Sequence, residues 1–170
     1  MKIYTKFSHT FLFLAFFAFV FAGTFSACKE EDGLSIYAIN EGRFDLNENE
    51  YVTMKIVSEE GTNNTLAFLR VENHTERLLG YGTYFTLQYY NKNNWEPDLL
   101  HGSVWEDIKY GLLGGETEER VNISLFIKSY NNNKKGRYKI TKQFDLTSDW
   151  FSGSGDMIGG IILSTEFEVK

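Results

Sequence analysis

Apolar and polar residues alternate along much of the chain after Tyr51, and this period of two constrains the fold more than any other feature. Just after Tyr51, for example, Val52, Met54 and Ile56 alternate with polar side chains. Successive side chains of a strand point to opposite faces, so the pattern predicts strands with one buried and one exposed face. We expect strands at or near residues 35–39, 52–56, 66–71, 85–89, 121–127, 138–144 and 161–169.

The segments between these predicted strands are rich in Gly and Asn, which favour turns. No segment has a convincing amphipathic helical pattern, and the best candidate, residues 103–110, is expected to be a loop with at most one helical turn. About seven strands joined by turns favour an all-β fold, an antiparallel β-sandwich of two sheets packed face to face. A small closed β-barrel is the alternative.

The first residues have the composition of a signal peptide. Lys2 and Lys6 precede the apolar run at residues 11–22 (FLFLAFFAFVFA), and no other charged residue occurs before Lys29. A helix of that length reaches roughly 18 Å, which is short of the roughly 30 Å hydrocarbon core of a bilayer. We therefore predict a signal peptide at residues 1–27, with an uncleaved anchor helix as the alternative.

Small residues directly before the single cysteine, Cys28, resemble the lipobox of bacterial lipoproteins. Phe25 stands where that motif usually has Leu, and it keeps the bulky apolar character. The resemblance implies cleavage before Cys28 and acylation, for example with palmitate, of its sulfur and its new amino group. Each buried CH₂ adds about 0.8 kcal/mol, so two or three acyl chains would anchor the protein permanently to a membrane. A chance cysteine after an ordinary cleavage site at Ala27 is the alternative.

Four charged residues, Lys29, Glu30, Glu31 and Asp32, follow Cys28. A lysine and acidic residues at this place resemble the export signal of surface lipoproteins from Bacteroidota. The resemblance implies an outer-membrane lipoprotein exposed at the cell surface, and a periplasm-facing lipoprotein with a solvated acidic tether is the alternative. We accordingly predict a polar tether at residues 28–50 and one domain at residues 51–170.

The order and spacing of six segments carry a further resemblance: 69–75 (LRVENHT), 81–88 (YGTYFTLQ), 94–95 (NW), 115–117 (GET), 136–140 (GRYKI) and 166–169 (EFEV). Together they are similar to a bacterial immunoglobulin-like (Ig-like) domain, from about Tyr51 to Lys170. Gly114 replaces a proline of the family pattern, and residues 151–160 form a long insertion. The resemblance implies an Ig-like β-sandwich, and a fold of this kind does not define an activity.

Residues that could carry chemistry are few. Cys28 is the only cysteine, which excludes an intramolecular disulfide framework and a thiolate zinc site. His101 has Asp98 and Glu106 nearby in sequence, and a pocket that joined them would favour an enzyme, but solvated loop positions are the simpler interpretation. The 23 acidic residues outnumber the 17 basic ones, which argues against a nucleic-acid partner. We predict no enzyme, no cofactor and no metal site.

Aromatic side chains are the feature with binding potential. Trp95, Trp105 and Trp150 all fall in predicted loops or turns. Such rings can stack on sugars or anchor a protein partner, and alternatively they fold back over an end of the core.

Tyr138 is expected to be structural. It follows Gly136 at the start of a predicted strand and shares a face with Ile140, Lys142 and Phe144. In β-sandwiches this position often holds a tyrosine corner, in which the ring is buried and the hydroxyl bonds a backbone group.

These observations favour a non-catalytic, lipid-anchored Ig-like module of the cell envelope. Its role would be surface adhesion or an accessory part in a surface complex, with a protein or glycan partner that the sequence does not identify. One alternative is a glycan-binding lipoprotein of a polysaccharide-uptake system. Another is an enzyme inhibitor acting through a protruding loop.

Overall fold

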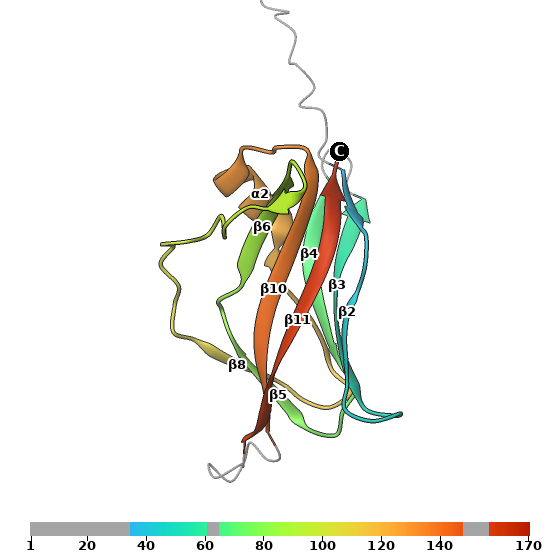
Figure 1. Ribbon diagram of the computed structural model, residues 1–170. Coiled ribbons are helices and arrows are strands. Elements are labelled where there is room, and N and C mark those ends of the chain that lie inside the picture. The colour runs from blue at the N-terminus through green and yellow to red at the C-terminus, as the bar shows by residue number, and fades with distance from the viewer. Residues whose placement is uncertain (1–34, 61–64, 148–156) are drawn as a thin grey trace, which may run out of the picture. The chain divides into compact units, whose positions relative to one another are not determined.

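The computed structural model describes residues 35–60, 65–147 and 157–170, which form two antiparallel sheets packed face to face (Figure 1). Cys28, the export-signal residues 29–32 and Trp150 lie outside the described residues. The two sheets do not close into a barrel. The prediction of an antiparallel Ig-like β-sandwich is therefore confirmed, and the barrel alternative is wrong.

The larger sheet is built around a long antiparallel pair, β10 and β11. Strand β1 pairs with β11 on one side, and β5 and β6 both pair with β10 on the other. Strand β8 extends the sheet beyond β5, and the short β7 pairs with β6. The strands are β1 (Ile36–Ala38), β5 (Leu78–Gly82), β6 (Thr86–Asn91), β7 (Asn94–Trp95), β8 (Lys109–Leu112), β10 (Gly136–Thr147) and β11 (Met157–Val169).

The smaller sheet has the order β2-β3-β4-β9 and covers the inner face of the larger one. Its strands are β2 (Gly42–Asp45), β3 (Tyr51–Glu60), β4 (Thr65–Asn73) and β9 (Thr117–Asn122). Strands β1 and β2 belong to the sheets, so the β-sandwich includes residues that the sequence analysis assigned to the tether. Strand β1 was predicted at residues 35–39, but β5 and β8 were not predicted; each is short, and their glycines weaken the alternation.

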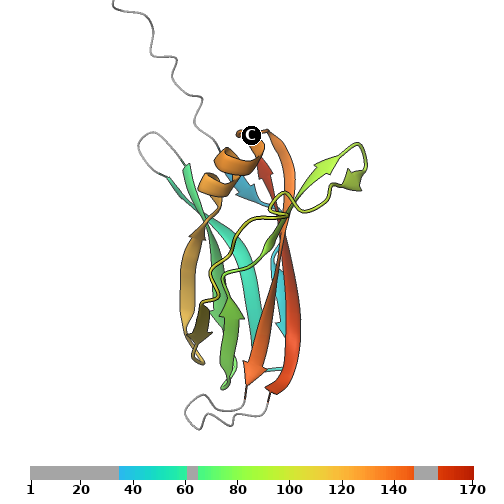
Figure 2. The same cartoon turned by 90° about the vertical axis from the view of Figure 1, so that its left-hand side faces the viewer.

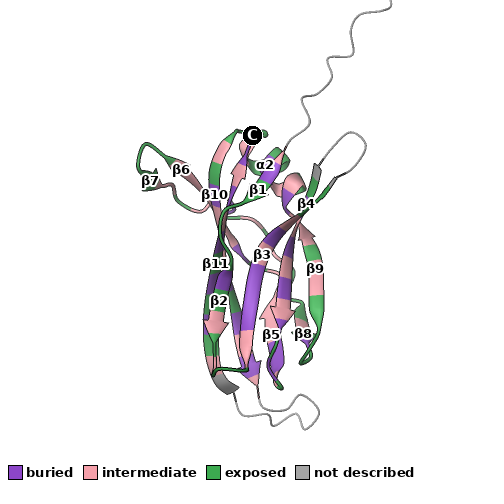
Figure 3. Ribbon diagram, turned by 90° about the vertical axis from the view of Figure 1, so that its right-hand side faces the viewer, coloured by how far each residue is buried: buried purple, intermediate pink, exposed green. Residues whose placement is uncertain are grey.

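The hydrophobic core lies between the sheets and follows the predicted period of two. On β3, Val52, Met54 and Ile56 are buried as predicted, but Thr53 is buried as well, and β3 is largely purple in Figure 3. Buried residues alternate with more exposed ones along β10 and β11, as predicted. The compact unit Leu34–Lys170 contains every residue of this core. It therefore carries its own core and is the part of the chain that folds by itself.

The strand predicted at residues 121–127 is wrong after Asn122. Strand β9 ends there, and residues Ile123–Asn131 form the helix α2. The same finding corrects the expectation that the chain has no amphipathic helix. A strand would have placed Leu125 on the buried face with Ile123 and Ile127, but Leu125 is 60% exposed.

Local and tertiary contacts together favour the helix. The side chain of Asn122 accepts a hydrogen bond from the Leu125 N–H and so caps the first turn. Asn132 adopts a left-handed conformation after the last turn, with φ 48° and ψ 45°. Ile123 and Ile127, four residues apart, share the face that is buried against the sandwich. Residues 103–110, the helix candidate in the sequence, form no helical turn.

Tyr138 lies fully buried on β10, with its ring 5.4 Å from that of Phe167 and 5.1 Å from that of Tyr89. Its hydroxyl donates to the Lys134 carbonyl at 2.5 Å and accepts from the Asn131 side chain at 2.8 Å. Burial raises the pKa of this phenol to about 12. The ring fills one end of the core, and the hydroxyl fastens the connection between α2 and β10.

Replacing Tyr138 should separate the contribution of the hydroxyl from that of the ring. We expect Tyr138→Phe to lower the free energy of unfolding by about 0.5–1.5 kcal/mol through the lost hydrogen bonds. Tyr138→Ala should lower it by roughly 3–5 kcal/mol, because a cavity forms. Urea melts of the unit Leu34–Lys170 measure both. Tyr37, which is 53% exposed, provides the control, since Tyr37→Ala should change stability by about 0.5 kcal/mol or less. An unchanged midpoint for Tyr138→Ala would contradict the buried position.

Candidate functional site

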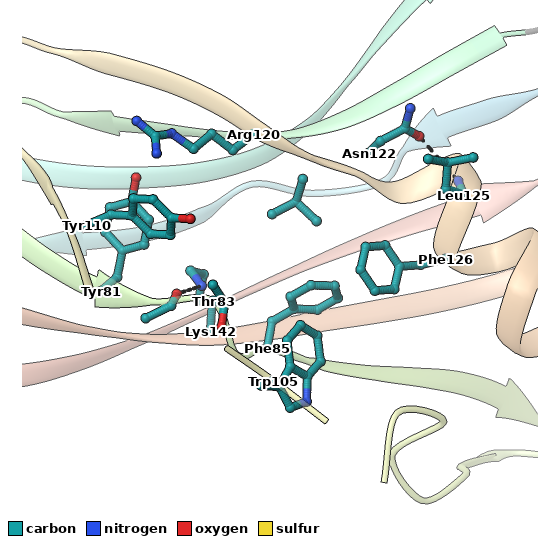
Figure 4. A pocket seen from close by; sticks show the side chains of 12 residues that line it. Tyr81, Thr83, Phe85, Trp105, Tyr110, Arg120, Asn122, Leu125, Phe126 and Lys142 are labelled. Carbon is teal, nitrogen blue, oxygen red and sulfur yellow. Dashed lines mark hydrogen bonds between the residues drawn. The ribbon is translucent and has the colours of Figure 1, made fainter. Parts of the chain in front are cut away.

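A pocket of about 330 Å³ opens at one side of the sandwich, between the edges of the two sheets (Figure 4). Strand β8 is an edge of the larger sheet and β9 an edge of the smaller one. The lining residues come from β8 and β9, from β5, β10 and α2, and from the segments between strands. No residue of β9 is fully buried, as its green and pink colours in Figure 3 show. The pocket is thus a part of the interior that no further strand covers.

Aromatic rings form one wall of the pocket. The ring of Phe85 lies 5.2 Å from that of Trp105 and 4.9 Å from that of Phe126, in edge-to-face arrangements. The rings of Trp105 and Phe126 are 6.2 Å apart and nearly parallel. These three residues come from segments that are distant in the sequence, and their mutual packing holds the wall in place.

A break in the neighbour of β10 shapes the part of the pocket around Lys142. Strand β10 pairs with β6 through Tyr138–Thr141 and with β5 through Asp145–Thr147. Between these two stretches, residues 142–144 of β10 face the longer segment 81–85. The register therefore shifts, and backbone groups of that segment leave the ladder and need other partners.

Lys142 supplies those partners. Its ammonium donates to the Gly82 carbonyl at 2.6 Å and to the Tyr84 carbonyl at 3.0 Å. The dashed line at Lys142 in Figure 4 marks the first of these bonds. Nζ also lies 5.2 Å from the centre of the Tyr81 ring. The residue is only 3% exposed, and burial lowers the pKa of its amine to about 8. At neutral pH the pocket therefore holds a buried cation.

Arg120 is the second cation of the pocket. It extends from the edge strand β9, its guanidinium lies 4.4 Å from the centre of the Tyr110 ring, and it pairs with Glu118. Tyr110 in turn lies 5.7 Å from Tyr81, ring centre to ring centre. Figure 4 shows Arg120 on the side of the pocket across from Lys142. No acidic residue lines the pocket within the described residues.

The tryptophans predicted as contact residues occupy different surroundings. Trp105 lies in the aromatic wall of the pocket. Trp95 lies in the β6–β7 hairpin, which extends away from the sheets in Figure 2, with its ring 5.1 Å from Tyr90 and 4.5 Å from the ammonium of Lys139. The structure therefore brings Trp105, and not Trp95, to the pocket.

His101, Asp98 and Glu106 do not form a catalytic group. Asp98 caps backbone N–H groups, because its carboxylate accepts from Leu87 at 2.8 Å and from Leu100 at 3.1 Å. His101 and Glu106 are exposed. Across the described residues, no cluster of His, Cys, Asp and Glu could hold a metal ion.

Of the residues that line the pocket, the sequence analysis named only Trp105 as a possible contact, although Lys142 left a signal. Lys142 occupies a buried-face position in the alternation of β10, between Ile140 and Phe144, and a lysine at such a position indicates a buried charge. Phe126 was missed because residues 121–127 were interpreted as a strand, which would turn its ring away from Ile127. No local signal indicates that these two residues and Trp105 share one pocket.

The fold and the pocket define an Ig-like β-sandwich with a cavity at one side. Residues 48–154, more than half of the chain, match the family model of the bacterial Ig-like domain, and the chain belongs to this family. Bacterial Ig-like domains are generally non-enzymatic and typically extracellular or associated with the cell envelope. Neither the curated proteins nor the solved structures contain a match to the chain. No helix among the described residues has the length and apolar character needed to cross a membrane.

The buried cation should make stability depend on pH in a defined window. Lys142 holds its proton less tightly in the folded chain (pKa about 8) than at its ordinary pKa of 10.5, so unfolding takes up a proton between these values. The free energy of unfolding should therefore rise with pH across this window, by about 3 kcal/mol in total. The groups facing Nζ are two carbonyls and the Tyr81 ring, and no carboxylate of the described residues forms an ion pair with it.

Urea melts at several pH values from about 7 to about 10 measure this contribution, using wild type, Lys142→Met and Lys139→Met. The rise assigned to Lys142 should disappear in Lys142→Met. It should persist in Lys139→Met, because Lys139 lies on the same strand but contacts Trp95 outside the pocket. A constant stability difference between wild type and Lys142→Met over this range would contradict the buried ammonium.

Proposed function

We propose that the chain is a lipid-anchored Ig-like module of the bacterial cell envelope, which acts by binding rather than by catalysis. Its role is surface adhesion or that of an accessory part in a surface complex. The observation that carries the proposal is the order of features along the chain: a short apolar segment at residues 11–22, then Cys28 preceded by small residues, then the Ig-like domain at residues 48–154.

The geometry of the domain supports a binding role. A pocket with an aromatic wall and two cations can hold a ligand through packing and charge. The histidine and the two acidic residues that the sequence offered for acid–base chemistry do not meet: Asp98 is occupied by backbone N–H groups, while His101 and Glu106 are exposed. The arrangement therefore favours reversible binding by a rigid module over turnover of a substrate.

Lipid anchoring predicts a specific effect of Cys28. In the wild type, an alkynyl fatty acid should label the protein, and the protein should enter the detergent phase on phase separation. Cys28→Ala should abolish labelling and move the protein to the aqueous phase, since the acylated sulfur is lost. Ser35→Ala, seven positions further along the chain, should leave both readouts unchanged. Persistent labelling of Cys28→Ala would overturn the anchor.

Exposure at the cell surface predicts that added protease reaches the protein, and that this depends on the charged residues after Cys28. Protease added to intact cells should degrade the wild-type protein while a periplasmic marker stays whole. Alanine at Lys29, Glu30, Glu31 and Asp32 together should protect the protein by retaining it inside the outer membrane, with fatty-acid labelling unchanged. Protection of the wild type from protease would show that the domain faces the periplasm.

A further inference from the structure

The charge of the pocket is opposite to that of the chain. The whole sequence has a formal net charge of −6, yet the charged side chains that line the pocket, Arg120 and Lys142, are both cationic. Arg120 is already paired with Glu118. The pocket is therefore suited to an anion, and Lys142 is the group that still lacks an anionic partner.

Lys142 also has an unused donor. An ammonium carries three N–H donors, and the structure gives two of them to the carbonyls of Gly82 and Tyr84. Within the described residues, no carboxylate lies within 4.0 Å of its Nζ. A buried cation is costly unless it is paired. A bound anion would supply both the missing acceptor and the missing charge.

The aromatic wall of the pocket favours a ligand of a particular shape. Phe85, Trp105 and Phe126 present ring faces and edges, which favour a flat apolar body. The volume of about 330 Å³ lies at the lower end of the range for small-molecule sites. It suits one or two fused rings rather than an extended chain.

We propose that this pocket binds a small organic anion in which a carboxylate is attached to an aromatic ring. The carboxylate accepts a hydrogen bond from the Lys142 ammonium, and the ring packs among Phe85, Trp105 and Phe126. This inference rests on the proposed non-catalytic binding role and names its ligand class. It does not depend on the lipid anchor.

Three matched probes test the proposal on the unit Leu34–Lys170 by isothermal titration calorimetry: 1-naphthaleneacetate, the neutral 2-(1-naphthyl)ethanol and acetate. Naphthaleneacetate should bind roughly tenfold or more tightly than the alcohol, because only it forms a charged hydrogen bond in a desolvated site. Acetate, which lacks the ring, should show no measurable binding. Equal affinity for acid and alcohol, or no binding of the acid, would overturn the proposal.

Variants of single residues test whether the probes bind in this pocket. Lys142→Met should lose the preference for the acid over the alcohol, whereas Lys139→Met should keep it. Trp105→Ala should weaken both aromatic probes, since their common ring loses its packing surface. If Lys142→Met retains the preference, the anion binds elsewhere and the proposal fails.

A pH series on the wild type gives an answer that needs no variant. The affinity for naphthaleneacetate should fall as the pH rises from about 7 to about 9.5, while the affinity for the alcohol stays constant. A pH-independent affinity for the acid would contradict the role of Lys142. These measurements use purified protein, so their failure leaves the cell-based results for Cys28 untouched, and a failure of anchoring leaves these results untouched.

Discussion

The ammonium of Lys142 is the interaction on which the open side of the sandwich depends. Where β5 gives way to β6, the register against β10 shifts and backbone carbonyls leave the ladder. The ammonium accommodates two of these, at Gly82 and Tyr84, and so holds the break in one conformation. Phe85 follows directly and turns into the aromatic wall. An apolar side chain at this position would fill space but could donate no hydrogen bonds to the freed carbonyls.

The arrangement of the two sheet edges explains why the pocket lies here. The chain passes from the edge strand β8 to the edge strand β9 in the other sheet, so that two neighbouring edges remain uncovered. Helix α2 and the segment with Trp105 narrow the opening without closing it. The ammonium is buried at a place where aromatic rings exclude water. The low local dielectric constant strengthens any charge interaction made there. The sandwich itself defines no activity, so a function of this chain has to be argued from local features of this kind.

Most of the fold could be predicted from the sequence, because alternation states directly which side chains share a face. This argument succeeded for β10 and β11, where buried and more exposed residues alternate as expected, and it placed Val52, Met54 and Ile56 of β3 correctly in the core. It failed for Ile123–Asn131, because Ile123, Leu125 and Ile127 have the spacing of a strand while the two isoleucines, four apart, equally fit one face of a helix. Asn122 was a usable signal, since Asn favours helix N-caps, but it was also compatible with a polar strand position.

The sequence by itself determined the class of fold, the buried faces of the long strands and the buried-face position of Lys142, because these follow from a local period of two. The tertiary structure alone decided that residues Ile123–Asn131 form a helix, since burial of Ile123 and Ile127 against the sandwich selects between two local possibilities. It also decided that Trp105, Phe126 and Lys142 line one pocket. Their proximity arises from pairing between distant strands, and no spacing along the chain encodes that pairing.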